Sequence, residues 1–356
     1  MRAEALAAAL VLAAAPSLAG DLGTEVTFAS ARGARFAVQA GPPAPRVLFD
    51  SGDSDAPAGE WDVLLIQGEL PDPSVRFMAL RPGGATVWVE LAVHRRADGR
   101  FWAKGRFQRK AGPLRLRAVD AGIAADHEVT VYSAEVFADS PDAPAAAAPP
   151  ARGPADPAAV PPAHHARAAW GARAPTNPLS PDPMPWRVTL HHSDGRYTAS
   201  LAESLQEARF IQEFHQDGRG WSDVGYHFLV DPLGNILEGR PLGTLGAHTQ
   251  SNNEGNVGIV LLGSYHAPKN HATTAAQLAS AAALGRFLVA RFGLDPDSLK
   301  GHRDYKKTDC PGDLAYPKLP ELRRAFDVPR APAIAASPDW DGQRGSSSAA
   351  KPTTDR

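Results

Sequence analysis

The stretch Val257–Leu262, which reads VGIVLL, is a continuous apolar run. A run of this length without polar alternation is typical of a central strand that is buried on both faces of a sheet. Upstream, Arg187–Leu190 is predicted to form a short strand that carries His191 at its end. A sheet with a buried centre is therefore expected in the second half of the chain.

Two capping boxes predict helices around these strands. Ser200–Glu203 reads SLAE and opens a helix with an apolar face, and Thr274–Gln277 reads TAAQ before an alanine-rich helix that ends at Gly293. Further elements are expected at Gly225–Asp231 and Ile236–Glu238, as strands, and at Leu319–Phe326, as a short helix. Together these elements predict an α/β fold with a mixed central sheet flanked by helices.

The first half of the chain has a different pattern. Residues 21–137 show strand-like alternation without helical periodicity, and turn signals such as Ala97–Gly99 separate the runs. The clearest runs are Val63–Ile66, Val87–Leu91, Leu114–Arg117 and Val129–Tyr132. A small all-β, sandwich-like domain is therefore expected before the α/β domain.

The role of this β domain stays open between targeting the protein to surface glycans and acting as a spacer or regulatory cap. Its aromatic residues are Trp61, Trp88, Phe101 and Trp102, among others. They favour a place in the core of the sandwich over a sugar-binding face, because aromatic side chains bury a large apolar area.

Composition predicts five segments. Residues 1–19 read as a signal peptide, with Arg2 before an apolar stretch and small residues before Gly20. Residues 21–137 form the β domain, 138–163 an Ala/Pro-rich linker, 164–328 the α/β domain and 329–356 a tail without periodicity. We expect an exported protein, periplasmic or extracellular, and the Ala/Arg/Pro-rich composition suggests a bacterium.

The charge balance excludes one class of partner. Lys and Arg number 37 and Asp and Glu number 39, whereas a nucleic-acid binder carries a strong basic excess. No stretch has the roughly 20 continuous apolar residues that a membrane span needs. We therefore expect no nucleic-acid partner, no membrane span and a monomer.

One cysteine, Cys310, lies eight residues after His302. A single thiol cannot form an intramolecular disulfide, which makes it unusual in an exported chain. Together with a histidine of the pair His191-His192, the two residues offer three ligands for zinc and leave the fourth position open, as in catalytic zinc sites. Alone, a His-His pair or a lone cysteine more often has a structural role.

The remaining motifs make the pattern specific. They are, in order, AWGAR at 169–173, LHHS at 190–193, GWSDVGYHF at 220–228, EGR at 238–240, GAHT at 246–249 with Asn253, VGI at 257–259, GHRD at 301–304 and TDCPG at 308–312. Over residues of about 165 to 326, the chain resembles the family of peptidoglycan recognition proteins and zinc-dependent N-acetylmuramoyl-L-alanine amidases, the type 2 amidases.

The resemblance implies a role for each matching residue. His191, His302 and Cys310 match the zinc ligands, so Zn²⁺ is the expected cofactor. Tyr226 matches a tyrosine whose hydroxyl assists at the scissile carbonyl. Thr308 matches a position that is threonine in many recognition-protein amidases and lysine in phage enzymes.

Other matches are less direct. Lys306 and Lys307 lie just before Thr308, so either an ammonium or a hydroxyl group supports the transition state. The resemblance places His248 and Asn253 in the substrate groove, although Asn253 also suits a turn. Asp304 either orients a histidine or caps a loop. Glu238 and Asp223 are candidate general bases, and a role in the fold is equally open for both.

The function implied is zinc-dependent hydrolysis of the amide bond between N-acetylmuramic acid and L-alanine in peptidoglycan, with a muropeptide as substrate. The alternative is a non-catalytic module that binds peptidoglycan. A third hypothesis, a cysteine nucleophile paired with His302, leaves Tyr226 and His191 without a role.

Overall fold

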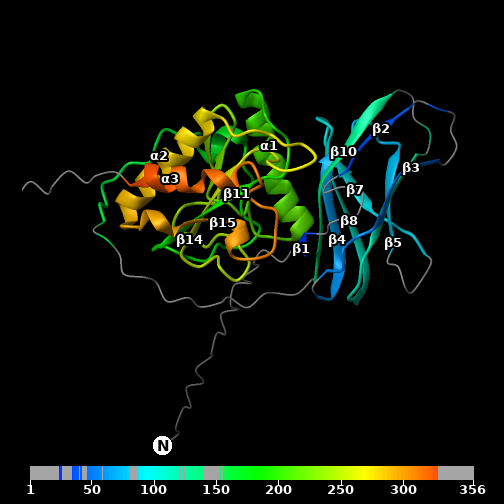
Figure 1. Ribbon diagram of the computed structural model, residues 1–356, viewed down its shortest axis with the longest axis horizontal. Coiled ribbons are helices and arrows are strands. Elements are labelled where there is room, and N and C mark those ends of the chain that lie inside the picture. Colours follow the sequence, from blue (N-terminus) through cyan, green and yellow to red (C-terminus); the bar gives the residue numbers. More distant parts are fainter. Residues whose placement is uncertain are drawn as a thin grey trace, which may run out of the picture.

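The computed structural model describes residues 24–25, 34–39, 41, 46–57, 59–80, 87–120, 122, 126–138, 153 and 155–327. Two units lie side by side, a β-sandwich from the first half of the chain and an α/β unit from the second (Figure 1). The predicted signal peptide and carboxyl-terminal tail lie outside the described residues.

The β-sandwich confirms the all-β prediction for the first half of the chain. Its larger sheet has the strand order β1-β10-β4-β8-β7, with β2 also paired to β10, and its smaller sheet has the order β3-β9-β5-β6. All pairs are antiparallel. The strands are β1 Thr24–Glu25, β2 Ala34–Val38, β3 Arg46–Asp53, β4 Trp61–Glu69, β5 Val75–Leu80, β6 Val89–Glu90, β7 Ala92–Arg95, β8 Arg100–Lys110, β9 Arg115–Asp120 and β10 His127–Phe137.

The aromatic residues of the sandwich lie mainly inside it. Trp61 and Phe101 belong to the core between the two sheets, and Trp102 is buried on the opposite face of its strand. Trp88 is half-buried, with the guanidinium of Arg117 4.1 Å from its ring centroid. These four side chains therefore do not form a common exposed face.

The α/β unit confirms the predicted mixed sheet. Its strand order is β13-β12-β14-β11-β15; β12, β14, β11 and β15 are parallel and β13 is antiparallel to β12. The strands are β11 Arg187–His192, β12 Phe228–Val230, β13 Ile236–Glu238, β14 Asn256–Leu261 and β15 Leu299–Gly301. The apolar run that begins at Val257 is thus the central strand, as predicted.

Helices cover both faces of this sheet. The α-helices are α1 Leu201–Glu213, α2 Ala275–Phe292 and α3 Leu319–Phe326; a π-helix, η2 Phe214–Arg219, continues α1, and the 3-10 helices are η1 Arg167–Trp170, η3 Pro296–Ser298, η4 His302–Asp304 and η5 Tyr316–Lys318. Ile259 and Leu261 of β14 pack with α2 and α3, whereas Val260 packs with α1. Alternate residues of a strand point to opposite faces, so β14 connects the two layers.

The predicted helix caps are present. The Oγ of Ser200 accepts a hydrogen bond from the backbone N–H of Glu203, and the Oγ1 of Thr274 accepts one from Gln277. Gly293 ends α2 with φ 66°, a conformation that glycine adopts without steric cost. Local sequence thus determines where these helices begin and end.

Part of the expected linker is described. The backbone N–H groups of Gly153 and Asp156 donate to carbonyls of Gly293 and Ala290, so this segment lies along the end of α2. The domain boundaries themselves stay predictions. In the described part of the chain, no helix is both long enough and apolar enough to cross a bilayer.

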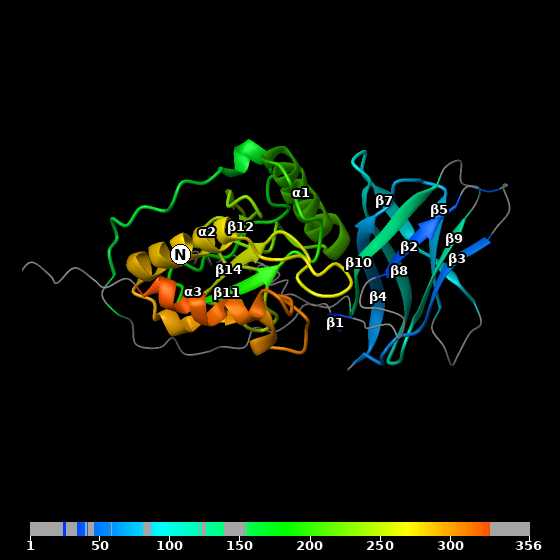
Figure 2. The same cartoon turned by 45° about the horizontal axis from the view of Figure 1, so that its top comes forward.

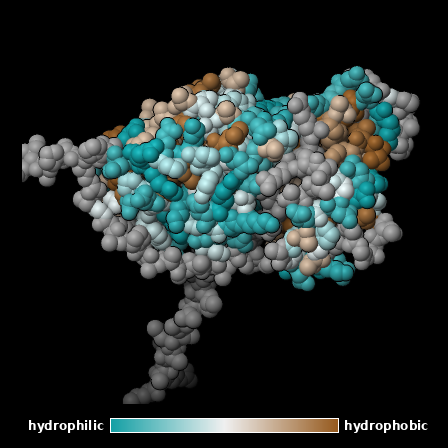
Figure 3. Space-filling model, in the orientation of Figure 1, coloured by the Kyte–Doolittle hydropathy of each residue, from teal (hydrophilic) through white to brown (hydrophobic). Residues whose placement is uncertain are grey.

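The surface differs between the two units. In the view of Figure 3 the α/β unit is mostly hydrophilic, and a compact hydrophobic area lies over the β-sandwich at the upper right.

Candidate active site

Three possible metal ligands converge at one edge of the α/β sheet. The ligand atoms of His191, His302 and Cys310 all lie within 4.8 Å of one another, and the three residues are 1%, 6% and 8% exposed. The Nδ1 of His191 is 3.5 Å from the Sγ of Cys310. The structure therefore brings together the three residues that the sequence predicted as zinc ligands.

Strand register explains why two of them meet. Leu190 of β11 pairs with Gly301 of the parallel strand β15, so His191 and His302 each follow a paired residue. The carboxyl ends of parallel strands meet at the same edge of a sheet, which places the two imidazoles side by side with ring centroids 4.6 Å apart.

A closed loop returns Cys310 to this edge. The backbone N–H of Arg303 donates to the carbonyl of Cys310 at 3.0 Å, and its guanidinium donates to the carbonyl of Asp309. The backbone N–H of His192 donates to the Sγ of Cys310 at 3.5 Å. These contacts hold the sulfur against the end of β11.

The environment keeps both imidazoles neutral. Burial holds the pKa of His191 and of His302 well below its ordinary value, and the neighbouring histidines and Lys306 lower both further. A neutral imidazole is the form that binds a metal ion, because the lone pair on its ring nitrogen is then available. Two neutral imidazoles and one cysteine sulfur are a donor set that fits zinc.

His248 lies behind His191, where its side chain bonds to other protein groups, and its predicted contact with substrate stays a prediction. Its side chain is buried, and its Nε2 donates to the carbonyl of Asn256 at 3.0 Å. Its Nδ1 is then the acceptor for the Nε2–H of His191, 3.0 Å away. That bond leaves the Nδ1 lone pair of His191 facing Cys310, so His248 selects the tautomer that can bind a metal.

Asn253 is also buried and forms a turn. Its Oδ1 accepts hydrogen bonds from the backbone N–H groups of His248 and Thr249, at 2.8 and 2.7 Å. These bonds are those of a turn residue, and the predicted contact of Asn253 with substrate stays a prediction.

A cavity of ≈ 90 Å³ is lined by two of the candidate ligands, His302 and Cys310, and the other residues lining it include Tyr226, Lys306 and Thr308. The ring centroid of Tyr226 is 5.1 Å from that of His191. The Oγ1 of Thr308 accepts a hydrogen bond from the backbone N–H of Cys310 at 3.2 Å. Both a lysine and a threonine therefore face this cavity, and Lys307 does not line it.

Asp304 caps the loop and does not orient a histidine. Its carboxylate accepts hydrogen bonds from the backbone N–H of Gly301 and from the hydroxyl of Tyr316, at 2.9 and 2.5 Å. The residue is exposed. The loop-capping alternative is thus the one observed.

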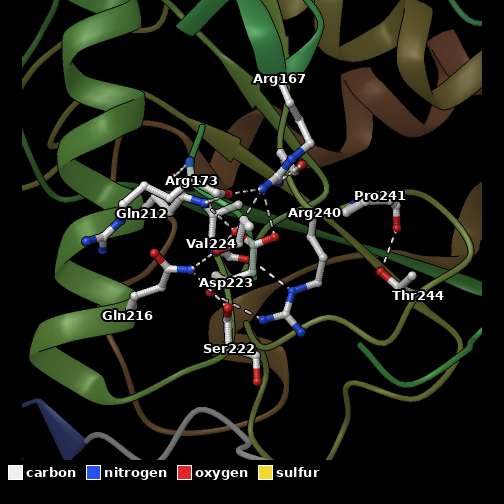
Figure 4. A network of polar contacts seen from close by, with 12 residues as sticks. Arg167, Arg173, Gln212, Gln216, Ser222, Asp223, Val224, Arg240, Pro241 and Thr244 are labelled. Atoms are coloured by element: carbon white, nitrogen blue, oxygen red, sulfur yellow. Dashed lines mark hydrogen bonds and ion pairs between the residues drawn. The ribbon is translucent and has the colours of Figure 1, made fainter. Parts of the chain in front are cut away.

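The two candidate general bases belong to the fold. Asp223 is fully buried; it accepts from Gln212 at 2.6 Å and forms an ion pair with Arg167 at 2.9 Å (Figure 4). Glu238 accepts a hydrogen bond from the backbone N–H of Arg167 at 3.1 Å. Neither carboxylate lines the cavity, so the network in Figure 4 is structural.

The sequence did not identify four residues of the β-sandwich that line the same cavity, namely Gln67, Arg100, Ser133 and Glu135. One signal for them was present. Val63–Ile66 is continuously apolar, and such a strand is buried on both faces. A sandwich strand with only one face in the core alternates instead, so a contact partner on the second face was predictable.

The buried His227 near this site gives a prediction on pH. Burial lowers the pKa of His227 to about 4, and unfolded histidine titrates near 6.5. Between pH 6.5 and 4 the unfolded chain binds a proton that the folded chain does not. The free energy of unfolding is therefore expected to fall as the pH falls, by on the order of 2 kcal/mol at pH 5 for this one group.

Urea unfolding at pH 7.5 and pH 5 measures this change. His227→Gln is expected to show a smaller loss between the two pH values, whereas His164→Gln, at an exposed position, keeps the loss of the parent protein. An equal loss in the parent and in His227→Gln would contradict the prediction.

Geometry and donor set together define a class: an α/β protein with a mixed sheet whose parallel strand ends hold a three-ligand site of the His/His/Cys kind. Residues 181–313 match the family model described as N-acetylmuramoyl-L-alanine amidase. Peptidoglycan-recognition protein SC2 of Drosophila simulans is 35% identical over 144 residues, which cover 40% of this chain and 77% of that protein. The chain therefore belongs to the family of peptidoglycan recognition proteins and N-acetylmuramoyl-L-alanine amidases.

Other relatives carry the second name. The N-acetylmuramoyl-L-alanine amidase of Sus scrofa is 36% identical over 173 residues, which cover 44% of this chain and 27% of the pig protein. Among solved structures, wild-type PGRP-LB of Drosophila aligns with a TM-score of 0.40 at 34% identity, over 44% of this chain and 92% of that one. The matched relatives thus include proteins named for recognition and proteins named for hydrolysis.

Proposed function

We propose that this protein is a zinc-dependent N-acetylmuramoyl-L-alanine amidase, which hydrolyses the amide between N-acetylmuramic acid and L-alanine. The observation that carries the proposal is the buried cluster of His191, His302 and Cys310, in which His302 and Cys310 line a cavity together with Tyr226. Three protein ligands with a cavity at the fourth position are typical of catalytic rather than structural zinc.

The donor set supports zinc in particular. A cysteine sulfur with two imidazoles suits zinc, whereas magnesium and calcium prefer oxygen ligands. When bound, zinc supplies a hydroxide nucleophile near neutral pH and polarises the amide carbonyl. His248 contributes by holding His191 in the ligand tautomer, through the 3.0 Å hydrogen bond between the two rings.

The side chains of the cavity supply the remaining functions. The hydroxyl of Tyr226 donates a hydrogen bond to the carbonyl oxygen as negative charge develops on it. The ammonium of Lys306, which lines the same cavity, stabilises that charge from the loop before Cys310. Thr308 holds the loop, because its hydroxyl oxygen accepts a hydrogen bond from the Cys310 amide, and its side chain lines the cavity.

The proposal extends to the setting of the reaction. The apolar segment at 1–19 supports export to a periplasmic or extracellular space in a bacterium, where peptidoglycan is the substrate. The second hypothesis is a module that binds peptidoglycan without cutting it. It is supported by the relatives that are named as recognition proteins.

Release of new amino termini from soluble disaccharide-peptide monomers, prepared from purified peptidoglycan, decides between the two hypotheses. The zinc-loaded protein is expected to release L-alanine amino groups, and a chelator to stop the release until zinc is restored. Binding without release by protein that holds one zinc per chain would refute the amidase proposal and support the binding module.

Tyr226→Phe tests the proposed donor. Loss of one hydrogen-bond donor to a developing oxyanion lowers kcat by roughly 100- to 1,000-fold. We expect kcat to fall by about that factor while zinc content and KM stay near those of the parent. A fully active Tyr226→Phe protein would show that this tyrosine only packs in the cavity.

A further inference from the structure

The centre of the larger sheet of the β-sandwich is buried on both faces. Leu64 and Ile66 of β4 point into the core of the sandwich, and the alternate residues Val63 and Leu65 belong to a hydrophobic cluster with Phe210 and other residues of α1. Trp102 and Phe137, from β8 and β10, join the same cluster. The two units therefore share a packed hydrophobic cluster, and the contact between them resembles the core of a domain.

A buried ion pair fixes this contact. Arg100 of β8 and Glu207 of α1 are 1% and 0% exposed, and both pairs of donor and acceptor atoms lie at 2.9 Å. The guanidinium also donates to the carbonyl of Gly68 and to the Oε1 of Gln67, and it lies 3.8 Å from the ring centroid of Phe210. A fully bonded buried network of this kind holds its parts in one arrangement.

The same network of hydrogen bonds extends to the end of β11, the strand that carries the candidate ligand His191. The Nε2 of Gln67 donates to the backbone carbonyl of Asp194 at 2.6 Å and to the Oγ of Ser133 at 3.1 Å. Asp194 follows His191 by three residues and has φ 43°, a conformation that few non-glycine residues adopt. The sandwich thus holds the segment through which the chain leaves β11.

The sandwich also closes one side of the cavity. Figure 2 shows β11 pointing with its carboxyl end toward the sheet that contains β10 and β4. Gln67, Ser133 and Glu135 line the cavity from this side, and Glu135 forms an ion pair with Arg219 at 2.5 Å. The cavity of ≈ 90 Å³ is smaller than the roughly 300 to 1,000 Å³ of usual small-molecule sites, so most of any muropeptide must lie outside it.

We propose that the β-sandwich is a fixed wall of the catalytic cavity, which fits the enzyme to free muropeptides and excludes peptidoglycan that continues into polymer, through its sugar or through its peptide, on the side that the sandwich closes. The inference rests on the proposed amidase function. The scissile amide joins a sugar on one side to a peptide on the other, and in the intact wall both sides continue into polymer. The β-sandwich closes one side of the cavity. A substrate therefore fits only if its sugar or its peptide, whichever faces the sandwich, ends there and does not continue into polymer.

Soluble fragments of one preparation test this inference without the slow access of an insoluble wall. They are the disaccharide-peptide monomer, the peptide-cross-linked dimer and the uncross-linked glycan strand with several stem peptides. The monomer is expected to react at least about tenfold faster per scissile amide than one of the two extended fragments. Equal rates on all three fragments would refute the proposal that the β-sandwich limits which substrates fit the cavity.

Binding to the chelator-treated full-length protein, measured by calorimetry, separates this inference from the amidase proposal. Selective binding of the monomer, without hydrolysis by the zinc-loaded protein, would support the proposed role of the β-sandwich and refute the proposed amidase function. Hydrolysis together with equal binding of all three fragments would support the amidase function and refute the proposed role of the β-sandwich.

Variants connect the effect to the sandwich. Ser133→Leu adds apolar volume at the wall, and Glu135→Gln removes its charge; each is expected to lower kcat/KM on the monomer by about tenfold at unchanged zinc content. The matched control, Glu90→Leu, lies on β6 of the other sheet, where the side chain is half exposed, and is expected to change neither value. Parental kcat/KM in both wall variants would show that substrate does not touch the sandwich.

Discussion

Cys310→Ser is expected to lose its bound zinc and at least about 99% of amidase activity, because a serine hydroxyl stays protonated at neutral pH and is a poor zinc ligand. The two histidines alone leave the ion with too few protein ligands. The side chain replaced is 8% exposed and its Sγ lies 3.5 Å from the Nδ1 of His191.

Zinc per chain, measured by elemental analysis after dialysis, checks this result alongside amino-terminus release. Lys307→Ala serves as the control, because Lys307 is exposed on the same loop and does not line the cavity. It is expected to keep both zinc and activity. A Cys310→Ser protein with one tightly held zinc would remove Cys310 from the ligand set. Inactivation by thiol alkylation with no effect of chelator would point instead to the cysteine nucleophile.

Arg100→Met is expected to lower the free energy of unfolding by about 3 to 5 kcal/mol, because it leaves the carboxylate of Glu207 buried without its charge partner. Both side chains are essentially inaccessible to water, and Arg100 bonds to Glu207, Gln67 and Gly68 at once. The double variant Arg100→Met/Glu207→Leu is expected to recover much of the loss, since two apolar side chains then meet.

Urea unfolding of the full-length protein measures these changes. The control is Arg76→Met, which breaks an ion pair with Glu90 whose partners are 58% and 51% exposed. Exposed pairs contribute less than about 1 kcal/mol, so this variant is expected to unfold like the parent. If Arg100→Met lowers the free energy of unfolding no more than the control does, the contact between the two units is loose. The β-sandwich could then not act as a fixed wall of the cavity.

Much of the α/β fold was predictable because its signals are local. Capping boxes at Ser200 and Thr274 and the glycine at 293 mark helix ends through contacts within a few residues. The continuous apolar run from Val257 marks the central strand for the same reason. These patterns act over short stretches, so no distant part of the chain is needed to read them.

The candidate site was predictable only in part. The motif spacing singled out His191, His302 and Cys310, and the structure brings them together. It did not distinguish His248, which orients His191, from a groove residue, because the motif does not state which way a side chain faces. Nor did it separate Lys306 from Thr308, which both line the cavity.

The sequence by itself thus determined the donor set and the order of the elements that carry it, since residue type and short-range periodicity are properties of the chain alone. Only the tertiary structure decided that His248 orients a candidate ligand and that the β-sandwich closes one side of the cavity. Gln67 and Asp194 are 127 positions apart, and Arg100 and Glu207 are 107 apart. Contacts over such separations depend on how two packed units meet, and no local pattern records that.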